Sequence, residues 1–276
     1  MSPAVRSRES PLVLALDTGD LRQALDWSLA AGEAAGMVKV GLELFGAEGP
    51  AVVAALAGQG RRVMLDLKLH DIPATVAGAV RSAERAGAEL VTVHALGGPA
   101  MLAAAAEAAG ACRVAAVTVL TSAGPAEVAA AGLPPVEEAV PRLAELAVAS
   151  GCQALVCSPL EVAAVRTLLG EAAELICLGV RSAAGPEGRP SIHGAHPPGG
   201  APAQREQMRR RYLADPLAHD QARVATPAAA MEAGASWIVV GRPVTGAADV
   251  AAAASAIRDQ ALAAGRARRP HSGTTP

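Results

Sequence analysis

Short apolar runs with the length and composition of β-strands recur along the chain, and alanine-rich stretches with the length of helices separate them. Eight runs stand out, at residues 12–17, 37–41, 62–68, 89–94, 113–119, 153–158, 174–180 and 236–241. Helices are expected at residues 20–35, 50–59, 73–86, 100–109, 135–150, 160–169, 227–233 and 247–263. Several of the runs are apolar throughout, which is typical of parallel strands that helices cover on the outside.

Eight strand–helix units in about 250 residues predict an α/β protein with the (β/α)8 TIM-barrel architecture. A doubly wound open sheet is the alternative, because periodicity alone cannot show whether the sheet closes. No G-x-G-x-x-G motif follows the first strand, which disfavours a dinucleotide-binding domain. We expect a single barrel domain over residues 1–276, with its core at about residues 12–264.

One interval interrupts this alternation, between the seventh strand and the helix expected at residues 227–233. Residues 182–218 are rich in Gly, Pro and His, and a loop of this length is either functional or disordered. We expect a long insertion there, and its first half is expected to be mobile. His193 and His196 could bind a metal ion, although a solvated pair is the more common arrangement in such a loop. The tail at residues 265–276 is expected to be disordered.

Composition narrows the class of protein. Hydrophobic residues make up 51% of the chain and charged residues 18%, which excludes an intrinsically disordered protein. A net charge of −2 and an aromatic content of 1% argue against nucleic-acid binding. The longest uncharged stretch, residues 90–106, contains glycine and proline, so neither a membrane span nor a secretory signal is expected. The four cysteines are interpreted as reduced, buried thiols of a cytoplasmic protein: Cys112, Cys152, Cys157 and Cys177.

Of the 24 Lys and Arg residues, only Lys39 and Lys68 are lysines. Active sites of barrels lie at the carboxyl ends of the strands, where Lys68 follows Asp66 by two positions on one strand. Residues two apart on a strand face the same way, so these two and Lys39 can form a Lys–Asp–Lys row that Asp71 could extend. Arginine cannot replace a compact ammonium that must approach a reacting carbon and give up a proton. The pattern favours a catalytic site, with a structural ion-pair network as the alternative.

A second group of residues predicts a phosphate site. Gly241 and Arg242 follow the eighth strand and Arg181 follows the seventh, where barrels commonly bind phosphate. Glycine lets a backbone N–H approach an anion, and arginine supplies a bidentate contact. We therefore expect a phosphorylated ligand.

Three other residues near strand ends have two interpretations each. Asp17 could hold a ligand hydroxyl or cap the following helix. His94 could be a ligand or a satisfied histidine at the barrel mouth, and His70 could orient either Asp71 or the loop.

Residues 66–75, which read DLKLHDIPAT, resemble the D-x-K-x-x-D-I-x-x-T signature of the bacterial-type orotidine 5′-phosphate decarboxylase family. Other segments are similar to that family and occur in its order: ALD at 15–17, VKVGLELF at 38–45, VHALGG at 93–98, LTS at 120–122, HDQARVATP at 219–227 and IVVGRPVT at 238–245. The resemblance extends from about residue 12 to residue 257, and the ordered set is far more specific than the signature alone.

The resemblance implies a barrel lyase that converts orotidine 5′-monophosphate to UMP and CO2, the last step of de novo pyrimidine biosynthesis, without a metal or organic cofactor. It also implies that the catalytic row consists of Lys39, Asp66, Lys68 and Asp71, with Lys68 as the proton donor. By the same resemblance the enzyme is a homodimer in which Asp71, Ile72 and Thr75 reach the neighbouring subunit's site.

The family also implies the substrate contacts. Asp17 and Thr75 match contacts to the ribose hydroxyls, and Thr121 matches a contact after strand five. The phosphate end is matched by four residues: Arg181, Gln221, Gly241 and Arg242.

The chain departs from the family in two places. One is Leu178, where members usually have a proline. The other is the insertion at residues 182–218, which lies where the resemblance implies a lid over the phosphate, and we expect its distal part to be mobile without ligand. Two other functions stay open. One is a metal-dependent sugar-phosphate lyase of the broader superfamily, which carries a metal-binding Glu at the position of Lys39. The other is a non-catalytic nucleotide-binding protein. The lysine disfavours the first and the complete four-residue row disfavours the second.

Overall fold

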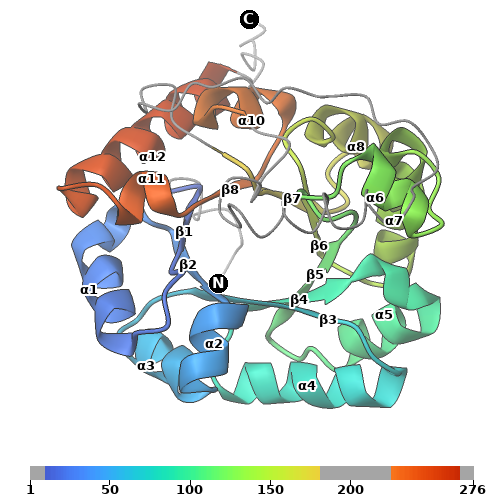
Figure 1. The fold of residues 1–276 in the computed structure, drawn as a ribbon, viewed down its shortest axis with the longest axis horizontal. Helices are drawn as coiled ribbons and strands as arrows, with labels where there is room; N and C mark the ends of the chain where they lie inside the picture. Colours follow the sequence, from blue (N-terminus) through green and yellow to red (C-terminus); the bar gives the residue numbers. More distant parts are fainter. Residues whose placement is uncertain (1–9, 181–224, 268–276) are drawn as a thin grey trace, which may run out of the picture.

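The structure, a computed structural model, describes residues 10–180 and 225–267. Eight parallel strands close into a barrel in the order of the chain, and β8 pairs with β1 (Figure 1). The predicted (β/α)8 barrel is therefore confirmed, and the open-sheet alternative is wrong. The insertion at residues 182–218 lies outside the described residues.

The strands begin and end within three residues of the predicted positions. They are β1 (Leu12–Ala15), β2 (Met37–Gly41), β3 (Val63–Leu69), β4 (Leu90–His94), β5 (Arg113–Val117), β6 (Ala154–Cys157), β7 (Glu174–Cys177) and β8 (Trp237–Val240). Most are shorter than the apolar runs, because several residues after the last ladder pair continue as loops that line the barrel mouth.

Helices surround the barrel (Figure 1). They are α1 (Leu21–Ala31), α2 (Leu42–Glu48), α3 (Ala51–Gly58), α4 (Pro73–Arg85), α5 (Gly98–Glu107), α6 (Pro125–Ala130), α7 (Val136–Ala149), α8 (Val162–Leu169), α10 (Pro227–Ala233), α11 (Arg242–Thr245) and α12 (Val250–Ala267), with short 3-10 turns η2 (Gly32–Ala34) and η3 (Ala95–Gly97). Three of these were not expected from the sequence: α2, α6 and α11. The last helix, α12, continues to Ala267, so the first residues of the expected disordered tail are helical.

The core has two shells, because successive side chains on each strand point to opposite faces. Inward-pointing residues such as Val13, Met37 and Met64 fill the barrel. Outward-pointing residues such as Leu14 and Val38 pack against the helices. All four cysteines are free and buried, as expected.

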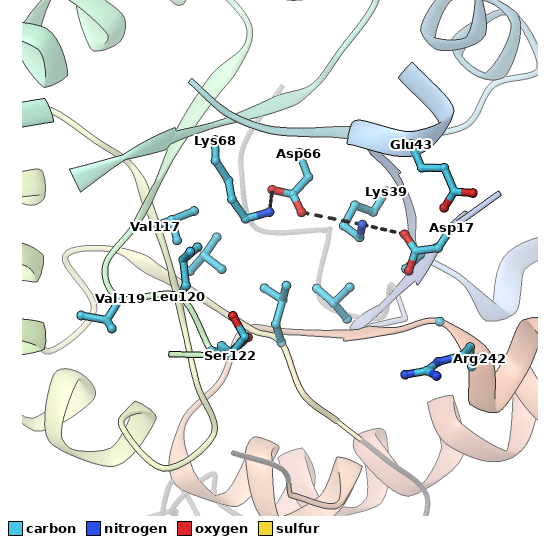
Figure 2. A pocket seen from close by; sticks show the side chains of 16 residues that line it. Asp17, Lys39, Glu43, Asp66, Lys68, Val117, Val119, Leu120, Ser122 and Arg242 are labelled. Atoms are coloured by element: carbon cyan, nitrogen blue, oxygen red, sulfur yellow. Dashed lines mark hydrogen bonds and ion pairs between the residues drawn. The ribbon is translucent and has the colours of Figure 1, made fainter. Parts of the chain in front are cut away.

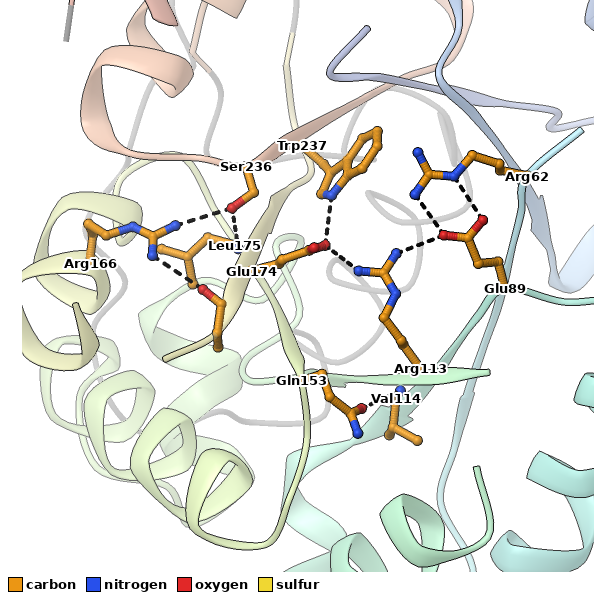
Figure 3. A network of polar contacts seen from close by, with 11 residues as sticks. Arg62, Glu89, Arg113, Val114, Gln153, Arg166, Glu174, Leu175, Ser236 and Trp237 are labelled. Carbon is orange, nitrogen blue, oxygen red and sulfur yellow. Dashed lines mark hydrogen bonds and ion pairs between the residues drawn. The ribbon is translucent and has the colours of Figure 1, made fainter. Parts of the chain in front are cut away.

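A network of charged side chains closes the amino-terminal end of the barrel (Figure 3). Arg113 donates to Glu89 at 3.1 Å and forms an ion pair with Glu174 at 2.7 Å. Arg62 makes a two-fold contact with Glu89 and lies over the ring of Trp237, whose indole N–H donates to Glu174. These residues begin or directly precede their strands, so the network lies at the end opposite to the strand carboxyl ends.

Among the described residues, no helix is both long enough and apolar enough to span a membrane.

Candidate active site

A cavity of about 500 Å³ opens at the carboxyl ends of the strands, where barrel enzymes have their active sites. Seven of the predicted catalytic and binding residues line it: Asp17, Lys39, Asp66, Lys68, Thr121, Gly241 and Arg242. They come from the ends of β1, β2, β3, β5 and β8, so the barrel brings together residues that are far apart along the chain.

Four charged side chains form a continuous row across this cavity (Figure 2). Lys68 Nζ lies 2.9 Å from Asp66 Oδ1, and Lys39 Nζ lies 3.7 Å from Asp66 Oδ2. On its other side, Lys39 donates to Asp17 Oδ1 at 3.0 Å. The Lys–Asp–Lys row predicted from strand spacing is therefore present, and Asp17 extends it at the β1 end.

The barrel pleat explains why these polar side chains share the cavity. Ala15 pairs with Lys39, and Gly41 pairs with Asp66, across neighbouring parallel strands. Lys39 follows the inward-pointing Met37 by two positions, and Asp66 follows Met64 in the same way. On each strand the inward-pointing residue deep in the barrel is apolar, and the next inward-pointing residue, two positions closer to the mouth, is charged.

The charges at the centre of the row are almost excluded from water. The side chain of Lys39 is 8% exposed and that of Asp66 is 3% exposed. Burial alone would lower the pKa of Lys39, but the nearby carboxylates of Asp66 and Asp17 outweigh it and raise that pKa. Burial likewise opposes ionisation of Asp66, but Lys39, Lys68 and a hydrogen bond from Thr92 hold its pKa below the ordinary value. Both groups are therefore charged at neutral pH.

Strand β3 is irregular where it carries Asp66 and Lys68, two of the four catalytic candidates. Leu65 pairs with Val91 and Leu69 pairs with Val93, so four steps along β3 match two steps along β4. Lys68, inside this bulge, has φ = 49° and is the one non-glycine residue with positive φ in the described part of the chain. Such a conformation costs about 1–3 kcal/mol and is found where surrounding contacts hold it in place. The expected same-side placement of Asp66 and Lys68 is thus produced by a bulge rather than by a regular pleat.

Thr92 on β4 is a site residue that the sequence analysis missed. Its hydroxyl donates to Asp66 Oδ1 at 2.9 Å and accepts from the backbone N–H of Lys68 at 2.8 Å. The signal was available, because Leu90 points into the barrel and Thr92, two positions later, must share its face. A polar residue at a buried inward position needs a partner.

Two glycines let the backbone pass close to the charged row. A Cβ at Gly41 would lie 3.0 Å from Lys39 Nζ, and one at Gly241 would lie 3.2 Å from Asp17 Oδ2. Arg242 follows Gly241 at the start of α11 and lies at the opposite side of the pocket from Lys68 (Figure 2).

Three predicted residues lie outside this cavity. Asp71, Ile72 and Thr75 are exposed, at the start of α4 and just before it, and the side chain of Asp71 accepts from the Ile72 N–H at 2.6 Å. Asp71 therefore does not extend the row within its own chain. Arg181 and Gln221 lie outside the described residues, as do His193 and His196.

The structure also shows the surroundings of the strand-end residues that had two interpretations. Asp20, not Asp17, caps α1 by accepting from the Gln23 N–H, so the capping interpretation of Asp17 is wrong. The ring of His94 stacks on His70 with centroids 5.5 Å apart, and its Nδ1 accepts from the Leu96 N–H. Burial, with help from His70 and Lys68, lowers the pKa of His94, which favours its neutral form.

Leu178 lines the cavity and packs against the inner core. Within the described ranges, no three His, Cys, Asp or Glu side chains are grouped closely enough to hold a metal ion.

The arrangement can place the Lys68 ammonium beside a bound molecule, position it against Asp66, and provide an arginine at the far end of the cavity. The closed barrel and its charged cavity at the strand carboxyl ends are the arrangement found in (β/α)8-barrel enzymes. The sequence model of the "Orotidine 5'-phosphate decarboxylase / HUMPS family" matches residues 10–195 and 214–257. The chain belongs to this family, as the sequence motifs had indicated.

Individual relatives agree with this assignment. An orotidine 5'-phosphate decarboxylase of Anaeromyxobacter sp. (strain K) is 50% identical over 245 residues, which cover 88% of this chain and 94% of that protein. One from Frankia casuarinae is 44% identical over 277 aligned residues, covering 94% of this chain and 90% of that protein. A crystal structure of orotidine 5'-phosphate decarboxylase from Lactobacillus acidophilus superimposes with a TM-score of 0.71 at 32% identity, covering 91% of this chain and 99% of that one. These relatives place the chain among the decarboxylases, which are carboxy-lyases.

Proposed function

We propose that this protein decarboxylates orotidine 5′-monophosphate to UMP and CO2, the last step of de novo UMP biosynthesis. The observation that carries the proposal is the buried Lys39–Asp66–Lys68 row in the cavity at the barrel mouth. Membership of the decarboxylase family and the printed names of its relatives support the same substrate.

The chemistry requires a charged group at the reacting carbon. When the bond between C6 and the carboxylate breaks, CO2 leaves and the electron pair stays on C6. A cofactor-free site must stabilise that carbanion electrostatically and then protonate it. Lys68 can do both, because its ammonium opposes the developing charge and donates the proton that forms the new C6–H bond. Solvent then returns a proton to the neutral amine.

Asp66 and Lys39 hold this ammonium ready before the substrate arrives. The Asp66 carboxylate lies 2.9 Å from Lys68 Nζ and fixes the position of that group in the cavity. Lys39 in turn keeps Asp66 ionised and close, and Lys39 also contacts the substrate in the proposed complex. A preorganised charge of this kind does not have to reorient during the reaction.

The proposed substrate lies along the cavity from Lys68 to Arg242. Asp17 would accept hydrogen bonds from the ribose hydroxyls, and Thr121 would contact the nucleotide from the β5 side. Gly241 and Arg242, together with Arg181 and Gln221, would bind the phosphate. The position of Arg242 across the pocket from Lys68 supports this orientation (Figure 2). Binding energy from a remote phosphate can then be used at the reacting carbon.

We further propose a homodimer in which Asp71, Ile72 and Thr75 complete the neighbouring subunit's site. The support is that these residues do not line the cavity of their own chain, although they belong to the signature that carries Asp66 and Lys68. Ile72 is a large apolar side chain that is 66% exposed in the single chain, as expected of a residue that a partner covers.

The remaining proposals concern organisation and location. We propose a single barrel domain over residues 1–276, and a lid over the phosphate for residues 182–218, which lie outside the described residues. The family match is interrupted at residues 196–213, inside this segment, which supports an insertion relative to the family. The free, buried cysteines fit a cytoplasmic protein, because thiols stay reduced in that compartment.

The fall in absorbance of orotidine 5′-monophosphate, followed with EDTA present, tests the proposal. We expect UMP and CO2 to form at an undiminished rate. Absence of turnover would refute the decarboxylase function. Turnover of a sugar phosphate that EDTA abolishes would instead favour the metal-dependent lyase, although Lys39 occupies the position of that enzyme's metal-binding Glu.

A further inference from the structure

Thr92 forms two hydrogen bonds that link the charged row to the backbone beneath it. We infer that Thr92 is a positioning residue for the decarboxylation, an inference that rests on the proposed function. Its single hydroxyl fixes at once the orientation of the Asp66 carboxylate and the unusual backbone conformation of Lys68.

The Thr92 hydroxyl both donates and accepts a hydrogen bond. A threonine hydroxyl has one proton to donate and lone pairs to accept. The proton goes to Asp66 Oδ1, at 2.9 Å, and a lone pair accepts from the Lys68 N–H, at 2.8 Å. Asp66 Oδ1 also accepts from Lys68 Nζ at 2.9 Å. Thr92, Asp66 and Lys68 therefore form a closed ring of contacts that includes both ends of the lysine residue.

The bulge in β3 explains why the hydroxyl is needed. Thr92 lies between Val91 and Val93, the two β4 residues that are in register with Leu65 and Leu69 on either side of the bulge. Inside a bulge the backbone N–H groups lose their regular ladder acceptors. Thr92 supplies an acceptor to one of them, at the residue with φ = 49°. Without this acceptor, the backbone of Lys68 could relax to a more common conformation. The Cα–Cβ bond of Lys68 would then point in another direction, and its ammonium would no longer be directed at Asp66.

The location of Thr92 indicates that it positions other residues and does not bind the substrate. Its side chain is fully buried and does not line the cavity that would hold the substrate. Its loss should therefore act through Lys68 and Asp66 on the chemical step, and only weakly on substrate affinity. This distinguishes Thr92 from Thr121, which lines the cavity.

The test compares Thr92→Val, which keeps the shape but removes the hydroxyl, with Thr92→Ser, which keeps the hydroxyl. The matched control is Thr118→Val, because Thr118 is equally buried and its hydroxyl donates to the Val156 carbonyl, outside the charged row. We expect Thr92→Val to lower kcat about tenfold or more with KM changed less than about threefold. Thr92→Ser should restore most of kcat, and Thr118→Val should retain it.

The pH profile gives a readout that a purely structural role would not move. The hydrogen bond from Thr92 favours ionised Asp66, so removing it raises the pKa of that carboxyl. The acid limb of kcat should therefore shift to higher pH in Thr92→Val and remain in place in Thr118→Val. If Thr92→Val does not fold, Thr92→Ala replaces it in the comparison with Thr92→Ser.

The outcomes distinguish a failure of the proposed function from a failure of the role assigned to Thr92. No turnover by the unmodified protein refutes the proposed function. Turnover by the unmodified protein, with equal kcat and equal acid limbs in the hydroxyl-free and Ser variants, overturns the role of Thr92 alone. A rise in KM with kcat unchanged in Thr92→Val would also overturn it.

Discussion

The Lys39 ammonium lies 3.7 Å from the Asp66 carboxylate, and both side chains are almost excluded from water. Two buried charges are tolerated when each supports the other, and removing one partner leaves the other costly to bury. This pair therefore links the stability of the fold to the charge state that the site needs.

Asp66→Asn should reveal this link through pH. Because the pKa of Asp66 is lower in the fold than its ordinary value of 3.8, ionised Asp66 contributes stability that is fully present above about pH 4. That contribution is lost as the pH falls through the lower, folded pKa. We expect Asp66→Asn to reduce the free energy of unfolding by about 1–3 kcal/mol near pH 7. The difference from the unmodified protein should shrink as the pH falls below 4, measured by urea denaturation. A difference that is constant with pH would contradict this.

The network at the opposite end of the barrel should affect stability without affecting catalysis. Arg113 bridges Glu89 and Glu174, and all three side chains are partly shielded from water. Arg113→Met should lower the free energy of unfolding by about 1–2 kcal/mol and leave kcat unchanged.

The control for that network is Arg142→Ala, because Arg142 pairs with Glu138 on the exposed surface of α7. This change should cost less than about 0.5 kcal/mol. Equal losses in the two variants, or a fall in kcat for Arg113→Met, would show that the network does not act as described.

Position 241 should require glycine, because a side chain there would crowd Asp17 and Ala15. A Cβ there would lie 3.2 Å from Asp17 Oδ2 and 3.4 Å from the Ala15 Cβ. Gly241→Ala should displace Asp17 and the phosphate end of the cavity, raising KM about tenfold or more. Gly58→Ala is the control, since a Cβ at this helical position meets nothing within 4 Å, and it should stabilise the fold by up to about 1 kcal/mol. An unchanged KM in Gly241→Ala would count against the proposed phosphate contact.

A shared site in the dimer predicts complementation between two inactive variants. Lys68→Ala and Asp71→Ala should each be inactive as pure proteins. In a dimer containing one subunit of each kind, one site combines an intact Lys68 with an intact Asp71. After random mixing, about one quarter of the unmodified activity per subunit should return. No recovery from mixed dimers of confirmed composition would refute the contribution of Asp71 across the interface.

Much of this site could be predicted because it follows from strand periodicity. Lys39 and Asp66 continue the inward-pointing positions of Met37 and Met64, and parallel strands bring their carboxyl ends together. The count of eight strand–helix units also favoured a barrel, but closure itself is shown only by the pairing of β8 with β1. Helix α2 was missed because its residues, Leu42–Glu48, follow strand β2 without a turn signal between them.

Other features depend on contacts between distant residues. The bulge in β3 arises from its pairing with β4, and no local pattern around Lys68 predicts a positive φ for a lysine. Thr92 acquires its role only from that bulge. The two interpretations of Asp17 could not be separated from the sequence, because its contact is with Lys39 on the neighbouring strand, and Asp20 caps α1 instead.

The central claim is that Lys68 supplies the proton for decarboxylation. The most direct test measures turnover of orotidine 5′-monophosphate by the unmodified protein, Lys68→Ala and Lys68→Arg, together with UMP binding and the unfolding curve of each. We predict turnover by the unmodified protein, a loss of at least about a thousandfold in both variants, and retained folding and UMP binding. Near-normal turnover by folded Lys68→Ala would contradict the account.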